Sequence, residues 1–168
     1  MSIRKLVPDD AEVFKAIRLR GLLEIPSAFS ASHEEEDTPL DIIAERLTPT
    51  PDGSILGAFL EGTLAGIIGI QRESQLKLAH KAYVWGMYVA PEFRRAGVGR
   101  ALVSRVLEIA GRELRVRSVN LGVNTRNEAA IALYTSMGFR TYGTEAGFLN
   151  VDGELHDEHL MARLLPNE

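Results

Sequence analysis

The sequence predicts an α/β fold with a mixed, mostly antiparallel central sheet, one parallel pair of strands and about four helices. Segments with helical and with strand-like spacing of apolar residues alternate along the 168 residues. A strand–helix–strand unit in the middle of the chain requires a parallel pair with a right-handed crossover. Turns typical of hairpins before and after this unit require antiparallel pairs. Since no linker or repeat interrupts the pattern, we expect one domain over residues 1–168.

Strands and two helices are expected in the first half of the chain. Pro8, Asp9 and Asp10 are typical of a helix start, and apolar residues follow with helical spacing. From Ser54 the period falls to two, and Glu61-Gly62 is typical of a hairpin turn. The expected elements are a strand over 3–6, a helix from 8, an irregular acidic connection over 26–39, a helix over 39–47, and strands over 55–60, 64–72 and 76–89.

The second half alternates helices with strands. An amphipathic helix is followed by Gly111, which is a candidate stop. Thr125 and Glu128 have the spacing of a capping box, and Asp152-Gly153 predicts a hairpin. The expected elements are a helix over 97–110, a strand over 118–123, a helix from 125 to 137 ended by Gly138, and strands over 141–151 and 154–165.

The composition argues against several classes of function. No apolar run is long enough to cross a membrane, and the N-terminus lacks the apolar core of a signal peptide, so we expect a cytoplasmic protein with no membrane partner. The absence of cysteine excludes disulfides, thiolate nucleophiles and cysteine-ligated zinc. The four histidines form no metal-binding motif, so no metal is expected. A net charge of −4 without a basic–aromatic pattern disfavours nucleic acid as a partner.

Charge is distributed unevenly along the chain. Residues 94–117 carry a balance of +5, which leaves −9 for the rest. Residues 21–45 hold seven acidic residues and no lysine or arginine. The basic segment suits an anionic ligand, and the acidic segment could attract a cationic one. Solvated loops and helix faces are the ordinary explanation of such charge runs.

Residues 83–99 have the features of an anion-binding turn. An apolar strand leads into a turn with the pattern R-x-x-G-x-G, formed by Arg94, Gly97 and Gly99, and then into a helix. Glycines let the backbone approach a ligand, and the free N–H groups and dipole at a helix N-terminus favour phosphate. The turn lacks the Lys-Ser/Thr of a P-loop and the third glycine of a dinucleotide fingerprint. The alternative is that these glycines only shape a tight turn.

A second motif downstream makes the pattern more specific. The run V-A-P-E-F-R-R-A-G-V-G-R-A-L, followed by N-x-x-A-x-x-L-Y-x-x-x-G-F at residues 127–139, resembles the GNAT superfamily of acyl-CoA-dependent N-acetyltransferases. The two motifs lie within 83–139, and the expected order of elements is similar to that fold over nearly the whole chain. The resemblance implies a GNAT-like sheet whose parallel pair lies at the cofactor site.

The resemblance also implies roles for residues of both motifs. In GNAT proteins the R-x-x-G-x-G turn binds the pyrophosphate of acetyl-CoA through backbone N–H groups. The strand before it pairs with the pantetheine arm, and one of its N–H groups polarises the thioester carbonyl. Tyr134 corresponds to the acid that protonates the leaving thiolate, although a core aromatic is its simpler explanation. The implied cofactor-binding residues are Met87, Tyr88, Val89, Arg94, Arg95, Ala96, Gly97, Val98, Gly99, Arg100 and Asn127, the last of which can also be a helix cap.

The general base is not identified by either motif, because residues 84–89 contain no carboxylate. Glu34 is our preferred candidate, since the acidic connection borders the acceptor site in this fold. An ordered water relay without a dedicated base is equally consistent with the sequence. The other candidates are Glu35, Glu36, Asp157 and Glu158, followed by His80 and His159.

These observations predict an enzyme that transfers an acetyl group from acetyl-CoA, or an acyl group from a longer acyl-CoA, to a primary amine. Direct transfer in a ternary complex is expected, since no cysteine can carry the acyl group. The acidic N-terminal region favours a small, cationic amine. The alternatives are acetylation of a protein N-terminus or lysine, and a CoA-binding sensor without catalysis. The apolar final strand is compatible with a homodimer interface.

Overall fold

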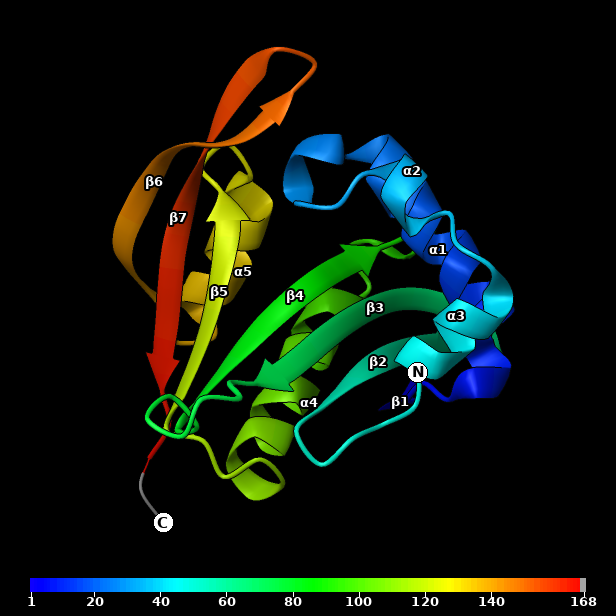
Figure 1. Cartoon of the computed structure of the whole chain (residues 1–168), viewed down its shortest axis with the longest axis horizontal. Helices are drawn as coiled ribbons and strands as arrows, with labels where there is room; N and C mark the ends of the chain where they lie inside the picture. The colour runs from blue at the N-terminus through cyan, green and yellow to red at the C-terminus, as the bar shows by residue number, and fades with distance from the viewer. Residues whose placement is uncertain (167–168) are drawn as a thin grey trace.

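The computed structural model describes residues 1–166, which form a mixed sheet of seven strands with helices on both faces (Figure 1). The strands lie in the order β1-β2-β3-β4-β5-β7-β6, and β4 and β5 are parallel while the other neighbours are antiparallel. The predicted fold class is therefore confirmed. The elements are β1 (Ser2–Lys5), α1 (Ala11–Glu24), α2 (His33–Glu36), α3 (Leu40–Arg46), β2 (Gly53–Leu60), β3 (Thr63–Arg72), β4 (Lys81–Val89), α4 (Val98–Arg112), β5 (Ser118–Asn124), α5 (Glu128–Ser136), β6 (Arg140–Val151) and β7 (Glu154–Leu164).

The helices cover the two faces of the sheet with separate apolar layers. On one face, Leu102, Val106 and Ile109 of α4 pack against the central strands in a cluster that also includes residues of α5. On the other face, Phe14 and Ile17 of α1 belong to a second cluster with residues of α3 and of the strands. The helical spacing read from the sequence therefore identifies the buried side of α4 correctly.

Several element boundaries differ from the sequence-based expectation. Helix α5 begins at Glu128 rather than at residue 125, because Asn127 caps it in place of the predicted capping box of Thr125 and Glu128. β4 begins at Lys81 rather than at residue 76, because residues 75–80 form turns in which Leu78 N–H donates to the carbonyl of Gln75 at 2.8 Å. Leu76 is 94% exposed, so the alternation of apolar residues that includes it does not mark a buried strand. Helix α4 continues through Gly111, and the left-handed residue after its end is Arg115, with φ of 53°.

The parallel pair is short, and this creates a split in the sheet. β4 pairs with β5 only from Lys81 to Tyr83. Beyond that point the pairing of β3 with β4 has a bulge, where Gly86 takes a φ of 65°. Figure 1 shows β4 and β5 diverging toward the upper edge of the sheet. The remaining backbone of β4 is thus not covered by β5, and this edge is open to a ligand.

Two helical glycines should respond in opposite directions to replacement by alanine. At Gly21 a Cβ would lie 2.9 Å from ring carbons of the buried Tyr88, whereas at Gly111 the nearest atom is 4.0 Å away. We expect Gly21→Ala to lower the free energy of unfolding by about 1–3 kcal/mol through overpacking. We expect Gly111→Ala to raise it by about 0.5–1 kcal/mol, because alanine favours the helix. Urea denaturation of both variants tests this, and two changes of the same sign would contradict it.

Candidate active site

Two cavities meet at the split between β4 and β5. The α4 cavity, of about 690 Å³, is lined by β4, the turn before α4, the first turn of α4, and α5. The hairpin cavity, of about 110 Å³, is lined by α1, the segment after α1, β4, β5 and the β6–β7 hairpin. The two cavities adjoin, because both are lined by Ala28, Phe29, Val84, Trp85, Gly86, Gly122 and Asn124.

The N-terminus of α4 forms an anion-binding turn at one end of the α4 cavity. Gly97 precedes the helix with φ of 79°, and no side chain caps the helix. The first helical bond runs from Ala101 N–H to the carbonyl of Gly97, so the N–H groups before it remain available. At Gly99 a Cβ would lie 2.9 Å from Met87 Cε and 3.2 Å from Leu133 Cδ2. The positive φ favours glycine at Gly97, and a side chain at Gly99 would displace the ends of Met87 and Leu133. The geometry of the turn fits a phosphate group.

Every residue that the sequence predicts to bind the cofactor lines the α4 cavity, with the exception of Ala96. Asn127 Oδ1 accepts a hydrogen bond from Ala130 N–H at 3.1 Å, so the helix-capping explanation accounts for this oxygen. Asn127 lines the cavity as well, and the two roles are compatible.

Tyr88 and Arg94 are connected through Glu24 at the end of α1. The Tyr88 hydroxyl donates to Glu24 Oε2 at 2.5 Å, and Arg94 Nη2 lies 2.6 Å from Glu24 Oε1. Burial and this hydrogen bond raise the pKa of Tyr88 to about 12. Arg94 Nε also donates to the carbonyl of Val89 at 3.0 Å. The Arg94 side chain thus holds the turn in place, and Tyr88 can offer the cavity its backbone rather than its hydroxyl.

Tyr134 of α5 extends from the opposite side toward β4. Its hydroxyl lies 3.2 Å from Met87 Sδ, and this is its one hydrogen-bond contact within residues 1–166. Its ring meets Phe139 edge-on, with centroids 5.8 Å apart. Burial raises the pKa of Tyr134 above the usual range, so the phenol is protonated at neutral pH. The hydroxyl is thus a proton donor at the junction of β4 and α5, where its partner is the weak acceptor Met87 Sδ.

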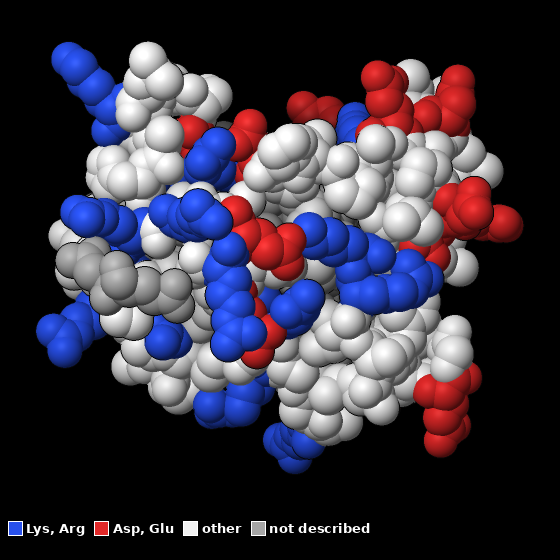
Figure 2. Space-filling model, turned by 90° about the horizontal axis from the view of Figure 1, so that it is seen from below, with Lys and Arg blue, Asp and Glu red and all other residues white. Residues whose placement is uncertain are grey.

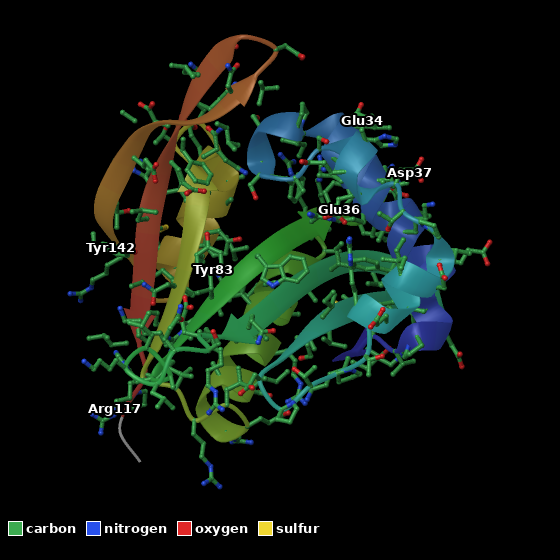
Figure 3. All side chains as sticks on the ribbon, in the orientation of Figure 1. Glu34, Glu36, Asp37, Tyr83, Arg117 and Tyr142 are labelled. Carbon is green, nitrogen blue, oxygen red and sulfur yellow. The ribbon has the colours of Figure 1, made fainter. Side chains whose placement is uncertain are left out.

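Glu158 of β7 contributes a carboxylate to the lining of the hairpin cavity. It lies directly over Gly122 of β5, where any Cβ would overlap its carboxyl group. Burial, and then the charge of Glu145, raise the pKa of Glu158 above its usual value. Tyr83 and Trp85 line the same cavity from β4, and Figure 3 shows Tyr83 near the centre of the sheet. Glu158 thus shares a cavity with Tyr83 and Trp85 of β4.

Glu34, our preferred base from the sequence, lies on the exposed surface of α2 and lines neither cavity (Figure 3). Glu35 accepts from Ser32 N–H as a helix cap, and Glu36 pairs with Arg46 at 3.0 Å. Asp157 lines the hairpin cavity, but its Oδ1 accepts from Gly147 N–H at 2.8 Å. His80 and His159 line neither cavity. Of the carboxylates left open by the sequence, Glu158 therefore has the most suitable position for a base.

Arg18 was missed by the sequence reading, although it falls on the apolar face of the predicted helix. It is only 6% exposed and lines the hairpin cavity. Its guanidinium carbon lies 4.9 Å from the centre of the Phe29 ring, and Nη2 lies 3.8 Å from Glu36 Oε1. Within residues 1–166, Nε and Nη1 have no hydrogen-bond partner. Burial lowers the pKa of Arg18, and the charge of Glu36 opposes this shift.

The charge runs seen in the sequence are divided among different places. Arg94, Arg95 and Arg100 line the α4 cavity, whereas four other arginines line a cavity at the far end of α4: Arg112, Arg115, Arg117 and Arg163. Figure 2 shows many Lys and Arg side chains on the lower face and Asp and Glu toward one edge, and Figure 3 places Arg117 at the lower end of the molecule. In the acidic segment, Glu24, Glu36 and Asp37 are paired with cations of the same chain.

Two kinds of feature are not found in the part of the chain that the structure describes. Across residues 1–166, no three His, Asp or Glu side chains are grouped closely enough to hold a metal ion. In the same part of the chain, no helix combines the length and the apolar character that a membrane span requires.

Comparisons with known proteins agree on one family. The family model described as "Acetyltransferase (GNAT) family" matches residues 19–139. The L-amino acid N-acetyltransferase AaaT of Escherichia coli is 31% identical over 120 residues, which cover 71% of this chain and 74% of that protein. The N-alpha-acetyltransferase RimI of Mycobacterium tuberculosis is 34% identical over 115 residues, covering 68% of each. The crystal structure of a GNAT acetyltransferase from Streptococcus pneumoniae superposes with a TM-score of 0.90 at 26% identity, covering 98% of this chain and 99% of the other.

Proposed function

The chain belongs to the GNAT family of acetyltransferases, and from this premise we propose that it transfers an acetyl group from acetyl-CoA directly to a small primary amine. It is an acetyl-CoA-dependent N-acetyltransferase. The observation that carries the finer proposal is the meeting of the two cavities at the split between β4 and β5. A donor in the α4 cavity and an acceptor in the hairpin cavity would react there without an acyl-enzyme intermediate.

We assign donor binding to the α4 cavity. The pyrophosphate of acetyl-CoA would accept hydrogen bonds from the N–H groups between Gly97 and Arg100, where the glycines leave room for it. The pantetheine arm would lie along Met87, Tyr88 and Val89, whose edge β5 does not cover. This arrangement directs the thioester toward the hairpin cavity.

The remaining groups supply the proton transfers of the reaction. An amine reaches the site as an ammonium ion, and we assign its deprotonation to Glu158. The free amine nitrogen forms a bond to the thioester carbon, and a backbone N–H of β4 stabilises the resulting oxyanion. When the carbon–sulfur bond breaks, Tyr134 donates its proton to the leaving thiolate. As the oxyanion re-forms the carbonyl, the nitrogen loses its second proton, which restores Tyr134. Glu158 releases the first amine proton to solvent, so the amide and CoA leave with one net proton released.

The choice of a small acceptor rests on the walls of the hairpin cavity. Residues 27–30 line it on one side and Phe148 and Leu149 of the hairpin on the other, within a volume of about 110 Å³. A protein N-terminus or lysine would need an open groove beside α1–α3. The cationic acceptor suggested by the acidic segment has less support, since several of its carboxylates are neutralised within the chain.

A screen of primary amines tests the proposed function. Each amine is incubated with the protein and acetyl-CoA, and release of the CoA thiol is measured. We expect at least one small amine to be acetylated with saturation in both substrates. Tight binding of acetyl-CoA without turnover of any amine, peptide or lysine would instead support the sensor alternative.

Tyr134→Phe should lower kcat by about 100-fold, because the leaving thiolate would lose its proton donor. The KM for acetyl-CoA should change little, since the ring and its contact with Phe139 are retained. Tyr142→Phe is the matched control, because Tyr142 is 62% exposed on β6 (Figure 3). Steady-state kinetics with an acetylated amine measure both effects. A kcat for Tyr134→Phe equal to that of the control would remove Tyr134 from the mechanism.

A further inference from the structure

We propose that Arg18 binds a carboxylate of the acceptor, so that the substrate is a small amino acid rather than a simple amine or a chain N-terminus. This inference rests on the proposed function, because it requires the hairpin cavity to be the acceptor site. It assigns a role to a buried cation that neither sequence motif includes.

The bonding of Arg18 is incomplete for a buried guanidinium. Nε and Nη1 are buried and have no partner within residues 1–166, and the Nη2–Glu36 distance of 3.8 Å is too long for a hydrogen bond. Glu36 also makes a shorter contact, of 3.0 Å, with Arg46. Buried charged groups are normally both paired and hydrogen-bonded, because desolvation without compensation is costly. An anion that accepted hydrogen bonds from Nε and Nη1 would therefore compensate the buried charge of Arg18.

Arg18 lines the hairpin cavity, with its buried Nε and Nη1 in the wall of that cavity. Its ring contact with Phe29 fixes the guanidinium from one side. On the other side, Nη1 lies 3.4 Å from the position that a Cβ on Gly86 would occupy, next to the bulge of β4. Arg18 thus lines the hairpin cavity together with the part of β4 where the two cavities meet.

The charges around the hairpin cavity match a zwitterion. Among the described residues that line it, Arg18 is the one Lys or Arg side chain, whereas Asp157 and Glu158 line it from β7. A carboxylate on Arg18 and an ammonium group toward Glu158 would satisfy both signs of charge. A planar, singly charged carboxylate suits a guanidinium, and a doubly charged group would be repelled by the two acids. An amide or a chain N-terminus has no charge to offer Arg18 at the same place.

The test compares free amino acids with their α-amides and with the amines that lack the carboxylate, each assayed by thiol release from acetyl-CoA. For the wild-type protein we expect kcat/KM to be about 10- to 100-fold higher for the free acids. Arg18→Gln should remove this preference mainly by raising the KM for the free acid, while the KM for acetyl-CoA stays unchanged. Arg20→Gln is the matched control, because Arg20 is the next arginine of α1 and pairs with Glu92 on the exposed surface. This control should keep the preference.

The outcomes separate the two proposals. Equal use of acids and amides by the wild-type protein, or an unchanged preference in Arg18→Gln, would overturn the role of Arg18 and leave the acetyltransferase proposal standing. If no amine of any kind is acetylated, the proposed function fails. In that case the role of Arg18 is tested by measuring the Tm of the protein with free amino acids and with their amides. The inference requires that the free acids alone raise the Tm. If Arg18→Gln does not fold, the role of Arg18 is tested by the wild-type comparison and by Arg18→Lys. We expect Arg18→Lys to retain part of the preference for free acids.

Discussion

Replacement of Glu158 by glutamine is expected to lower kcat by about 10²- to 10⁴-fold at neutral pH, because the amide cannot accept the ammonium proton. Glu158 lines the hairpin cavity, with its carboxyl group over Gly122 of β5. Steady-state kinetics with an acetylated amine measure the loss. Glu34→Gln is the control, since Glu34 is exposed and lines neither cavity, and it should keep wild-type kcat.

The stability of the same variant gives an independent readout. Burial, followed by repulsion from Glu145, raises the pKa of Glu158 in the folded protein. A carboxyl group with a raised folded pKa contributes most to stability below its unfolded pKa, and this contribution is lost as the pH rises through the folded pKa. At pH 7 the wild-type protein therefore bears the cost of a partly buried charge that glutamine lacks.

We expect Glu158→Gln to have a higher Tm than wild type at pH 7 and a smaller difference near pH 4. Retained activity in Glu158→Gln together with lost activity in Glu34→Gln would reverse the assignment and restore the base preferred from the sequence. A loss of both activity and stability at pH 7 would indicate a structural role for Glu158.

Gly97→Trp is expected to weaken acetyl-CoA binding by at least about 100-fold. A side chain at Gly97 meets no protein atom within 4 Å, so an indole would extend into the space assigned to the pyrophosphate. The left-handed φ of 79° adds backbone strain of about 1–2 kcal/mol for any residue other than glycine. This strain lowers stability, but it does not by itself block the cavity.

Gly62→Trp separates the two effects, because Gly62 has nearly the same backbone conformation, with φ of 83°, and equally open surroundings at the β2–β3 turn. Isothermal titration calorimetry with acetyl-CoA should detect the loss for Gly97→Trp alone. Equal affinities for both variants and the wild type would exclude the α4 turn as the pyrophosphate site.

Much of the fold could be predicted from local sequence. The Glu61-Gly62 and Asp152-Gly153 turns adopt positive φ angles where hairpins were expected. The predicted start of β4 at residue 76 was wrong. Leu76 and Leu78 repeat a strand-like pattern, but they lie within a turn of the described chain where no neighbouring strand pairs with them. The predicted end of helix α4 at Gly111 was wrong, because the left-handed position is taken by Arg115 instead. Arginine gives no local signal for such a position.

The candidate site likewise contains residues that the sequence could identify and residues that it could not. The anion-binding turn and Tyr134 lie in continuous motifs, so the sequence could point to them. Glu158 and Arg18 come from β7 and α1, and only the tertiary fold brings them to the same cavity. The acidity of the 21–45 segment favoured Glu34 as the base, but local sequence cannot show which carboxylates the fold brings to a cavity, and Glu34 lines neither of the two cavities.

The most direct test of this account is a crystal structure of the protein with CoA. We predict the pyrophosphate against the N–H groups between Gly97 and Arg100, and the thiol between β4 and β5, beside the Tyr134 hydroxyl and facing the hairpin cavity. The far end of α4 offers a competing basic cavity, lined by Arg112, Arg115, Arg117 and Arg163. A pyrophosphate bound there, or a thiol directed away from the split in the sheet, would contradict the proposed active site.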